Sequence, residues 1–549
     1  MITRNFTETV AAGIRDNWEK NAYSDYQGDT YLYKDVAEKV IRFGMIFEKH
    51  GIGIGSKVAL LGKNSRNWAI AYMSTILNGA VIVPILPDFH RDDVMHIVEH
   101  SESEVLFISE EYIPGIDVTK LPRVRAMVNL KDFSLVFAKE EGLKEDMANI
   151  QEAFDARYPK GFQPADFVLP KVTADDLVTI NYTSGTAGFS KGVVLTHRSF
   201  MANLDYAQKN MPLEAGNRIL AMLPLAHTFG CAFDFIFPTS LGCHITMLGK
   251  IPSPAIIVKA FAEIKPNLIM LVPLLMEKIY NGRIKPKIKK PVMKVLLAIP
   301  GINSVIRKKI RETLVQTFGG QFREVVMGGA ALNPEVERFL KSIGFKFAIG
   351  YGMTECGPLI SYAGWKYHRN GSSGRPVDTL EMKIDSFDPY QEIGEIMVKG
   401  DNVMVEYYKN PEATNATLTE DGWLRTGDLG VFDKDHYIYI KGRSKNMILG
   451  PSGQNIYPEE IESRLNNMPG ITESVVVDRN HKLVALVHSD PEYMTANQLT
   501  KEDLDDLMDK NRISINNKLP KYMQITAMEI FDAEFEKTPK KSIKRYLYK

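Results

Sequence analysis

The chain of 549 residues has only three cysteines, Cys231, Cys243 and Cys356. Three thiols cannot build a disulfide framework, so we expect a fold that depends on its hydrophobic core in a reducing compartment. The chain also has no net charge, because its 67 basic residues balance 67 acidic ones. No global electric field therefore favours nucleic acid as a partner.

Long apolar runs are absent as well. No stretch of about 18 consecutive apolar residues occurs, because Asn78, Pro84, Pro273 and Pro300 interrupt the best candidates. The first residues, Met-Ile-Thr-Arg-Asn-Phe-Thr-Glu, contain no apolar core of the kind found in secretory signals. These absences predict a soluble, cytoplasmic protein.

The residues that are present indicate an α/β enzyme with more than one domain. The length exceeds one ordinary domain, and an apolar content of 44% is sufficient for a large core. From Ser56 onward, strands alternate with helices: strands at 58–61, 80–85 and 105–108, and helices at 66–77 and 91–100. Such alternation predicts a parallel sheet covered on both faces.

The most informative stretch is the loop at 183–191, which follows an apolar, β-branched segment. Glycines allow a close backbone approach to an anion, hydroxyls and N–H groups donate to it, and a lysine adds a positive charge. We therefore interpret it as a phosphate-binding loop; the alternative is a solvated Gly/Ser turn. Its candidate ligands are Thr183, Ser184, Gly185, Thr186, Gly188 and Lys191.

Two further strands end in Gly-rich loops. Residues 325–327 lead into Gly328-Gly329-Ala330-Ala331, and residues 345–349 lead into Gly350-Tyr351-Gly352-Met353-Thr354-Glu355. Ligands of parallel sheets sit at such carboxyl ends, so both loops are candidates for one site. Beyond residue 441 the pattern becomes a compact α+β region, and we place the domains at 1–441 and 442–549.

Thr-Ser-Gly-Thr-x-Gly-x-x-Lys-Gly resembles the nucleotide loop of the adenylate-forming enzymes, which include acyl-CoA synthetases, firefly luciferase and peptide-synthetase adenylation domains. The chain departs from the family at Ala187, where Thr is usual, and at Ser190, where Pro is usual. The resemblance extends from about residue 25 to the C-terminus. It implies a large domain of parallel-sheet αβα subdomains with a β subdomain, followed by a small mobile α+β domain.

The resemblance also implies roles for the other motifs. Gly329, Ala330 and Ala331 would lie beside adenine and Tyr351 would stack on it, with Gly352 and Met353 in the same motif. Thr354 would donate to the α-phosphate, and Glu355 would hold Mg²⁺. Asp428 and Arg443 would contact the ribose. His227, in Pro-Leu-Ala-His-Thr-Phe-Gly, would lie beside the acyl pocket, although a lone His in an apolar run is also an ordinary core residue.

The expected catalytic lysine is where the match is poorest. The family motif resembles Lys-Thr-Pro-x-x-Lys-Ile-x-Arg, whereas residues 537–545 read Lys-Thr-Pro-Lys-Lys-Ser-Ile-Lys-Arg. Ser542 therefore stands where the lysine is expected, and Ser carries no charge. We predict that Lys541 supplies the charge, with Lys540 as second choice. Together with Lys541, the expected catalytic set is Thr186, Glu355 and His227.

The resemblance thus implies an ATP-dependent ligase that forms acyl-AMP and then transfers the acyl group to CoA, with a fatty acid as substrate. Alternatives are a medium-chain or aromatic acid, a carrier protein as acceptor, or a nucleotide-binding protein without ligase activity. One segment lies outside these motifs. Residues 278–311 contain eleven Lys or Arg and no Asp or Glu. The segment is either a solvated insertion or a patch for anionic lipid at the inner face of a membrane.

Overall fold

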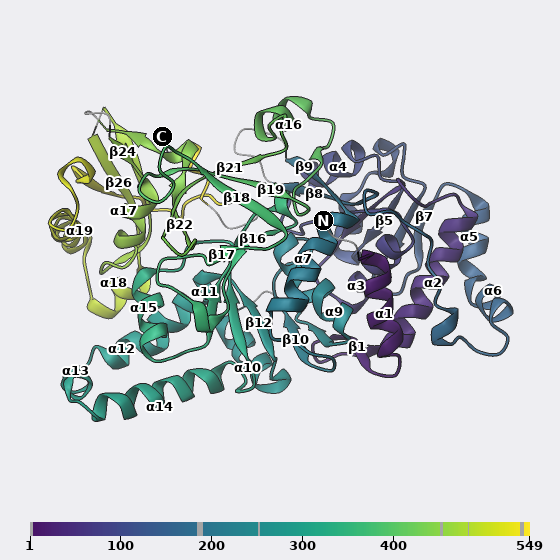
Figure 1. The fold of residues 1–549 in the computed structure, drawn as a ribbon, viewed down its shortest axis with the longest axis horizontal. Coiled ribbons are helices and arrows are strands. Elements are labelled where there is room, and N and C mark those ends of the chain that lie inside the picture. Colours follow the sequence, from purple (N-terminus) through teal and green to yellow (C-terminus); the bar gives the residue numbers. More distant parts are fainter. Residues whose placement is uncertain are drawn as a thin grey trace.

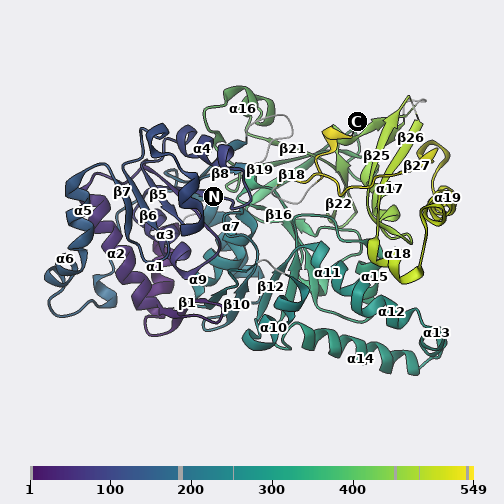
Figure 2. The same ribbon diagram turned by 180° about the vertical axis from the view of Figure 1, so that it is seen from behind.

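The computed structural model describes residues 4–183, 190–250, 253–450, 454–480, 482–538 and 543–548. The chain is elongated, with its N-terminal part at one end and its C-terminal part at the other (Figure 1). The middle of the sequence lies between these ends and carries the Gly-rich loops that begin at Gly328 and Gly350. The same order is seen from behind (Figure 2).

The N-terminal part is built on an eight-stranded sheet with the order β20-β9-β8-β4-β3-β5-β6-β7. Its strands are β3 (Lys57–Leu61), β4 (Val81–Ile85), β5 (Val105–Ile108), β6 (Ala126–Asn129), β7 (Leu135–Ala138), β8 (Leu177–Thr183), β9 (Lys191–Thr196) and β20 (Glu406–Tyr407). The five strands from β8 to β6 pair in parallel, as expected. At the edges, β7, β9 and β20 pair antiparallel, so the sheet is mixed. Residues 184–190 are too few for the crossover that a parallel β8–β9 pair needs.

Helices cover this sheet where the sequence predicts them. Ser65 and Thr196 cap the helices after them by accepting from the N–H of Trp68 and Ser199. Residues 67–77 of α3 are all buried, which explains why that helix is apolar on every face. The helices of this part are α1 (Phe6–Asp16), α2 (Tyr33–Lys49), α3 (Arg66–Leu77), α4 (Arg91–His100), α5 (Glu141–Ala148), α6 (Ile150–Arg157) and α7 (His197–Asn210).

Two smaller sheets form the middle. The first has the order β10-β11-β1-β2 and contains β10 (Arg218–Ala221), β11 (His244–Met247), β1 (Asn21–Asp25) and β2 (Thr30–Leu32). The second is parallel and contains β12 (Leu268–Leu271), β13 (Glu324–Met327) and β14 (Phe347–Ile349). Since β13 and β14 are neighbours, their two Gly-rich loops leave the same edge of the sheet. Asn333 caps α15 (Pro334–Ser342), as expected from its place before Pro334.

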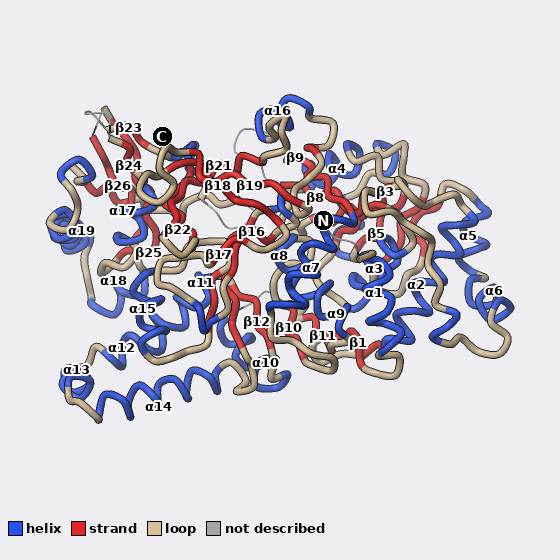
Figure 3. The backbone as a smooth tube through the Cα atoms, viewed as in Figure 1, coloured by secondary structure: helices blue, strands red, loops and turns tan. Residues whose placement is uncertain are grey.

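The connections of the middle are helical. Short helices α8 (Thr228–Gly230) and α9 (Phe237–Leu241) flank a π-helical turn at Cys231–Ile236. The chain between β12 and β13 forms α11 (Pro273–Ile279), a π-helical turn at Tyr280–Ile284, α12 (Lys285–Ile288), α13 (Pro291–Ala298) and α14 (Ile302–Thr317), while α10 (Pro254–Ile264) precedes β12. Figure 3 shows that helices and loops make up the corner formed by α12–α14.

A β region follows. The strands β15 (Tyr351–Gly352), β16 (Leu359–Tyr362) and β17 (Arg375–Pro376) form one antiparallel sheet. A second contains β18 (Leu380–Asp385), β19 (Gly394–Gly400), β21 (Leu424–Phe432) and β22 (Ile438–Arg443), with α16 (Pro411–Thr417) before β21. This matches the short strands expected between residues 381 and 439.

The C-terminal part has a hydrophobic core of its own, which includes Ile461, Leu465 and Leu504. Its elements are β23 (Ile448–Leu449), β24 (Asn455–Ile456), α17 (Pro458–Leu465), β25 (Ile471–Arg479), β26 (Lys482–Ser489), α18 (Pro491–Asn497), α19 (Lys501–Asn516) and β27 (Ala527–Ile530). Across the described segments of the chain, no helix combines the length and the apolar character that a membrane span requires.

Candidate active site

A buried carboxylate lies at the centre of the candidate site. Asp428 on β21 is 4% exposed and stands opposite Arg443 on β22. Its Oδ1 lies 2.8 Å from Nε of Arg443, and the hydroxyl of Tyr351 donates to its Oδ2 at 2.7 Å. Two residues from other strands, Tyr351 on β15 and Arg443 on β22, thus converge on the side chain of Asp428.

Burial and these partners act on Asp428 in opposite directions. Burial is the larger effect and raises the pKa of the carboxyl group, while Arg443 and the Tyr351 hydroxyl lower it. The pKa of Tyr351 is raised well above its usual value, first by burial and then by Asp428, so its hydroxyl remains a donor near neutral pH. The result is an acceptor group held rigidly beside a cation.

A second cluster joins Glu355 to the eight-stranded sheet. The hydroxyl of Tyr407 donates to Oε1 of Glu355 at 2.8 Å, and Nζ of Lys191 lies 4.8 Å from the centre of the Tyr407 ring. Burial, followed by Glu355, raises the pKa of Tyr407, which keeps its hydroxyl protonated. Sequence reasoning missed Tyr407, because its β20 strand has two residues and pairs with β9 from more than 200 positions away.

Much of the predicted phosphate loop lies outside the described residues. This holds for Ser184, Gly185, Thr186 and Gly188, and likewise for Lys540, Lys541 and Ser542. Thr183 and Lys191, which flank the loop, are opposite each other in the β8–β9 pair. The two residues that flank the loop therefore sit at the ends of paired strands, and Lys191 is itself part of the cluster with Tyr407 and Glu355.

The loops after β13 and β14 expose backbone toward the same region. Gly329 has φ +85°, which L side chains rarely adopt, and Gly329, Ala330 and Ala331 are exposed. A Cβ on Gly352 would stand 2.1 Å from the carbonyl oxygen of Pro358, so no larger residue fits there. Thr354 is buried in the turn after Met353, and Glu355 is half-buried.

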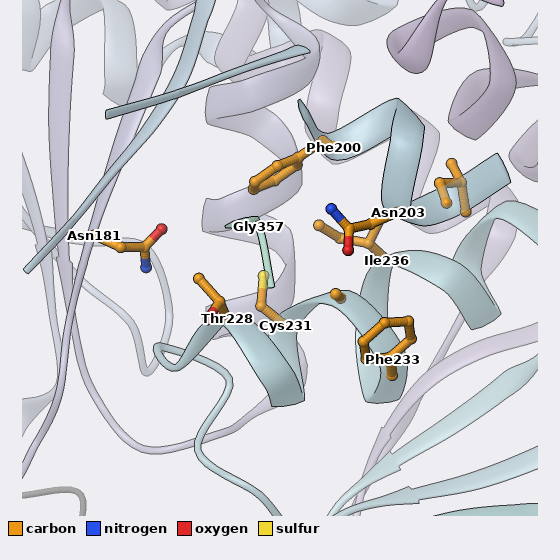
Figure 4. Close-up of a pocket in the computed structure, with 10 residues that line it drawn as sticks. Asn181, Phe200, Asn203, Thr228, Cys231, Phe233, Ile236 and Gly357 are labelled. Atoms are coloured by element: carbon orange, nitrogen blue, oxygen red, sulfur yellow. The ribbon is translucent and has the colours of Figure 1, made fainter. Parts of the chain in front are cut away.

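An apolar cavity of about 10 Å³ lies among side chains of β8, α7, α8 and the π-helical turn at Cys231–Ile236 (Figure 4). It ends at Gly357, two residues after Glu355, and Thr228 borders it from α8. No charged side chain is among its lining residues, which are Asn181, Phe200, Asn203, Leu204, Thr228, Cys231, Ala232, Phe233, Ile236 and Gly357. His227 is next to Thr228 in the chain but does not line the cavity; its Nδ1 accepts from the N–H of Phe229 at 3.3 Å and caps α8.

The described residues fit a cation that is held partly by substrate phosphates better than one held by protein side chains alone. No group of three or more His, Cys, Asp or Glu that could hold a metal occurs among them. Glu355 offers a single carboxylate near Lys191. Mg²⁺ commonly takes one or two carboxylates together with substrate phosphates, so this arrangement fits it. Asp428 and Arg443 in turn fit a ligand with hydroxyl groups.

Comparisons with known proteins agree with this geometry. The profile of the family described as AMP-binding enzyme matches residues 11–408. A long-chain-fatty-acid–CoA ligase of Salmonella typhimurium is 27% identical over 82% of this chain and 79% of its own length. A chloroplastic long-chain-fatty-acid–[acyl-carrier-protein] ligase of Arabidopsis thaliana is 26% identical over 83% and 71%. The crystal structure of an anthranilate CoA ligase with anthranoyl-AMP superposes with a TM-score of 0.77 at 22% identity, covering 99% of this chain and 96% of that one.

The buried carboxylate leads to a prediction about stability. Arg443→Ala leaves Asp428 without its counter-charge, and we expect a loss of about 2 kcal/mol in the free energy of unfolding. This is below the 3–5 kcal/mol typical of buried pairs, because the Arg443 side chain is 58% exposed. Adding Asp428→Asn should restore part of the loss, since an amide needs no counter-charge. Urea unfolding of the single and double variants measures this.

Arg425→Ala is the matched control, because Arg425 pairs at the surface with Glu395 at 3.0 Å. We expect it to lose less than about 1 kcal/mol. Equal losses for Arg443→Ala and Arg425→Ala would contradict the view that the buried Asp428 carboxylate depends on Arg443.

Proposed function

This chain belongs to the AMP-binding enzyme family, and we propose that it activates a long-chain fatty acid as acyl-AMP and transfers the acyl group to CoA. At the level of the family, the activity is that of an adenylate-forming acid–thiol ligase, which uses ATP, Mg²⁺ and CoA. The proposal adds the acyl substrate and the roles of individual residues.

The observation that carries the acyl substrate is the apolar cavity. It is lined by no charged side chain, and it borders Gly357, two residues after Glu355. At about 10 Å³ it has room for about one water molecule, so an acyl chain would enter by displacing the side chains that line it. A hydrocarbon chain gains free energy on leaving water for such a cavity, while its carboxylate stays near the polar loops. The names of the two curated relatives, both ligases for long-chain fatty acids, support the same substrate class.

We assign the nucleotide to the polar side of the site. Thr183, Ser184, Thr186 and Lys191, with the backbone of Gly185 and Gly188, would hold the β- and γ-phosphates. Asp428 would accept from the ribose hydroxyls and Arg443 would support it. The adenine would lie between Tyr351, Gly352 and Met353 on one side and Gly329, Ala330 and Ala331 on the other. The buried Asp428 and the exposed backbone of Gly329 support these places.

The remaining residues act on charge. Thr354 would donate to the α-phosphate, Glu355 would hold Mg²⁺, and Tyr407 fixes the Glu355 carboxylate through its hydroxyl. The charge of Mg²⁺ held there would offset part of the negative charge of the phosphates. The substrate carboxylate attacks the α-phosphorus and pyrophosphate leaves, so the residues serve mainly to position groups and stabilise charge. His227 would act through its cap on α8, by positioning Thr228, which lines the cavity.

We further propose two domains, 1–441 and 442–549, with a hinge at Lys445. The separate core of the C-terminal part supports this division. Polar contacts cross the boundary in this structure: Lys441 lies 3.7 Å from Glu460, Arg443 pairs with Asp428, and the hydroxyl of Ser444 donates to the carbonyl oxygen of Gly427 at 3.2 Å. Rotation about such a hinge would present a second face of the small domain for thioester formation.

The test of the proposed function is pyrophosphate release with a panel of acids, with and without CoA. We expect release with long-chain fatty acids and formation of the thioester only with CoA. Preference for a medium-chain or benzoic-type acid would contradict the acyl assignment, and transfer only to an acyl carrier protein would contradict the acceptor. Tight ATP binding without release for any acid would favour a non-catalytic nucleotide-binding protein.

The hinge makes a separate prediction. Lys445→Pro fixes φ at the pivot, so acyl-AMP formation should persist while transfer to CoA fails. Lys445→Ala removes the same charge but leaves φ unrestricted, and it should retain both steps. Single-turnover assays of each step measure this. If both steps fall in parallel in Lys445→Pro, the pivot lies elsewhere.

The source of the catalytic positive charge can be tested directly. If Lys541 supplies the charge, Lys541→Ala should slow acyl-AMP formation by about 10²–10³, the loss typical of one stabilising donor. Lys540→Ala is the matched control and should have little effect. A gain in Ser542→Lys from a weak wild type would instead show that the charge is missing from the native chain.

A further inference from the structure

The helix α13 is apolar, yet none of its described residues is buried. Its sequence is Pro-Val-Met-Lys-Val-Leu-Leu-Ala. Val292 is 71% exposed and Val295 is 63% exposed, and the patch continues through Ile299 and Ile302 to Val305, which is 68% exposed. Contiguous exposed apolar side chains of this kind mark an interaction surface rather than an ordinary one.

Exposed cations surround this apolar patch. Lys287, Lys289 and Lys290 are exposed just before α13, and Lys309 follows on α14. Lys285 is paired with Glu335 at 3.1 Å. By contrast, Lys287, Lys289 and Lys290 have no acidic partner within ion-pair distance among the described residues. The cations are therefore available to an external anion.

The position of this surface leaves it open. Helices α12, α13 and α14 form a projecting corner of the molecule, with α13 at its outer end in both views (Figures 1 and 2). The corner joins the core through the buried Leu314 of α14 and through Ile288 of α12, whereas no described residue of α13 packs against that core. None of the candidate active-site residues lies on this corner. It can contact a large flat surface without involving the active site.

We propose that the α12–α14 corner docks on an anionic lipid bilayer. The exposed aliphatic side chains of α13 enter the boundary between headgroups and acyl chains, while lysines on their long stems reach the anionic headgroups. Protein interfaces are typically centred on aromatic side chains, and this patch has aliphatic ones instead. That composition favours a bilayer over an acidic protein. The proposal is independent of the acyl substrate.

The experiment is co-sedimentation of the full chain with vesicles, without ATP or acyl substrate. We expect binding to phosphatidylcholine vesicles that contain about 30% phosphatidylglycerol, and little binding to phosphatidylcholine alone. Binding should weaken steeply between about 0.1 and about 1 M salt, because the Debye length falls from about 10 Å to about 3 Å. Since no substrate is present, failure of the proposed ligase activity would leave this result unaffected.

Matched variants separate the patch from the rest of the surface. Val292→Glu should weaken binding by at least about tenfold, whereas Val168→Glu, at a site 72% exposed and remote in sequence, should not. The double variant Lys289→Glu and Lys290→Glu should weaken it by at least about 25-fold, since each basic residue contributes about a factor of five. Lys160→Glu with Lys171→Glu, both exposed, is its control. Thermal unfolding checks that all four variants fold.

Three results would overturn the proposal. These are an absence of vesicle binding by the wild type, binding that salt and vesicle charge leave unchanged, and equal losses in the patch and control variants. A Val292-dependent dimer, or Val292-dependent binding of an acidic acyl carrier protein without vesicle binding, would assign the surface to a protein partner and would equally overturn it.

Discussion

The candidate site depends on a single buried carboxylate. Burying the Asp428 carboxylate costs free energy, because burial opposes its charged form and raises its pKa. The contacts from Tyr351 and Arg443 offset this cost, and in doing so they fix three strands relative to one another: β15, β21 and β22. Arg443 is also the last residue of β22, two positions before the proposed hinge at Lys445. The position of the ribose-side acceptor and the start of the proposed hinge are therefore set by the same contact.

Glu355 makes the second contact on which the site depends. Through Tyr407 it joins the loop after β14 to the edge of the eight-stranded sheet, where Lys191 begins β9. The short β20 strand exists only because it pairs with β9. Together the two links bring the ends of three sheets to one place. Each sheet supplies part of the polar surface, and the apolar cavity is lined mainly by α7, α8 and the π-helical turn after α8.

Features encoded locally were predictable from sequence. The bounds of α3 at Arg66–Leu77 and of α4 at Arg91–His100 match the expected ranges, and Thr196 and Asn333 act as the expected caps, because caps and periodicity depend on near neighbours. Long-range pairing was not predictable. Tyr407 was missed and the antiparallel edges of the large sheet were not foreseen, since nothing near either strand specifies its distant partner.

The capping role of His227 and the exposure of α13 were also not predicted from the sequence. The capping role of His227 could have been found, because the residue directly precedes a short helix, but the family motif drew attention to the acyl pocket instead. For α13, periodicity alone does not distinguish an apolar segment that is buried from one that is exposed. Only its place at the end of a projecting corner shows that its valines meet solvent.

The corner is built into a connection that the fold requires in any case. The strands β12 and β13 are parallel neighbours, so the chain between them must cross over with a helix, and α14 packs its buried Leu314 for this purpose. The segment of α12 and α13 is additional to that requirement and carries none of the polar groups around Asp428 or Glu355. Its sequence can change without disturbing the sheet or the site. The proposed membrane contact and the loops after β8, β13 and β14 therefore involve separate parts of the chain, so either could change without the other.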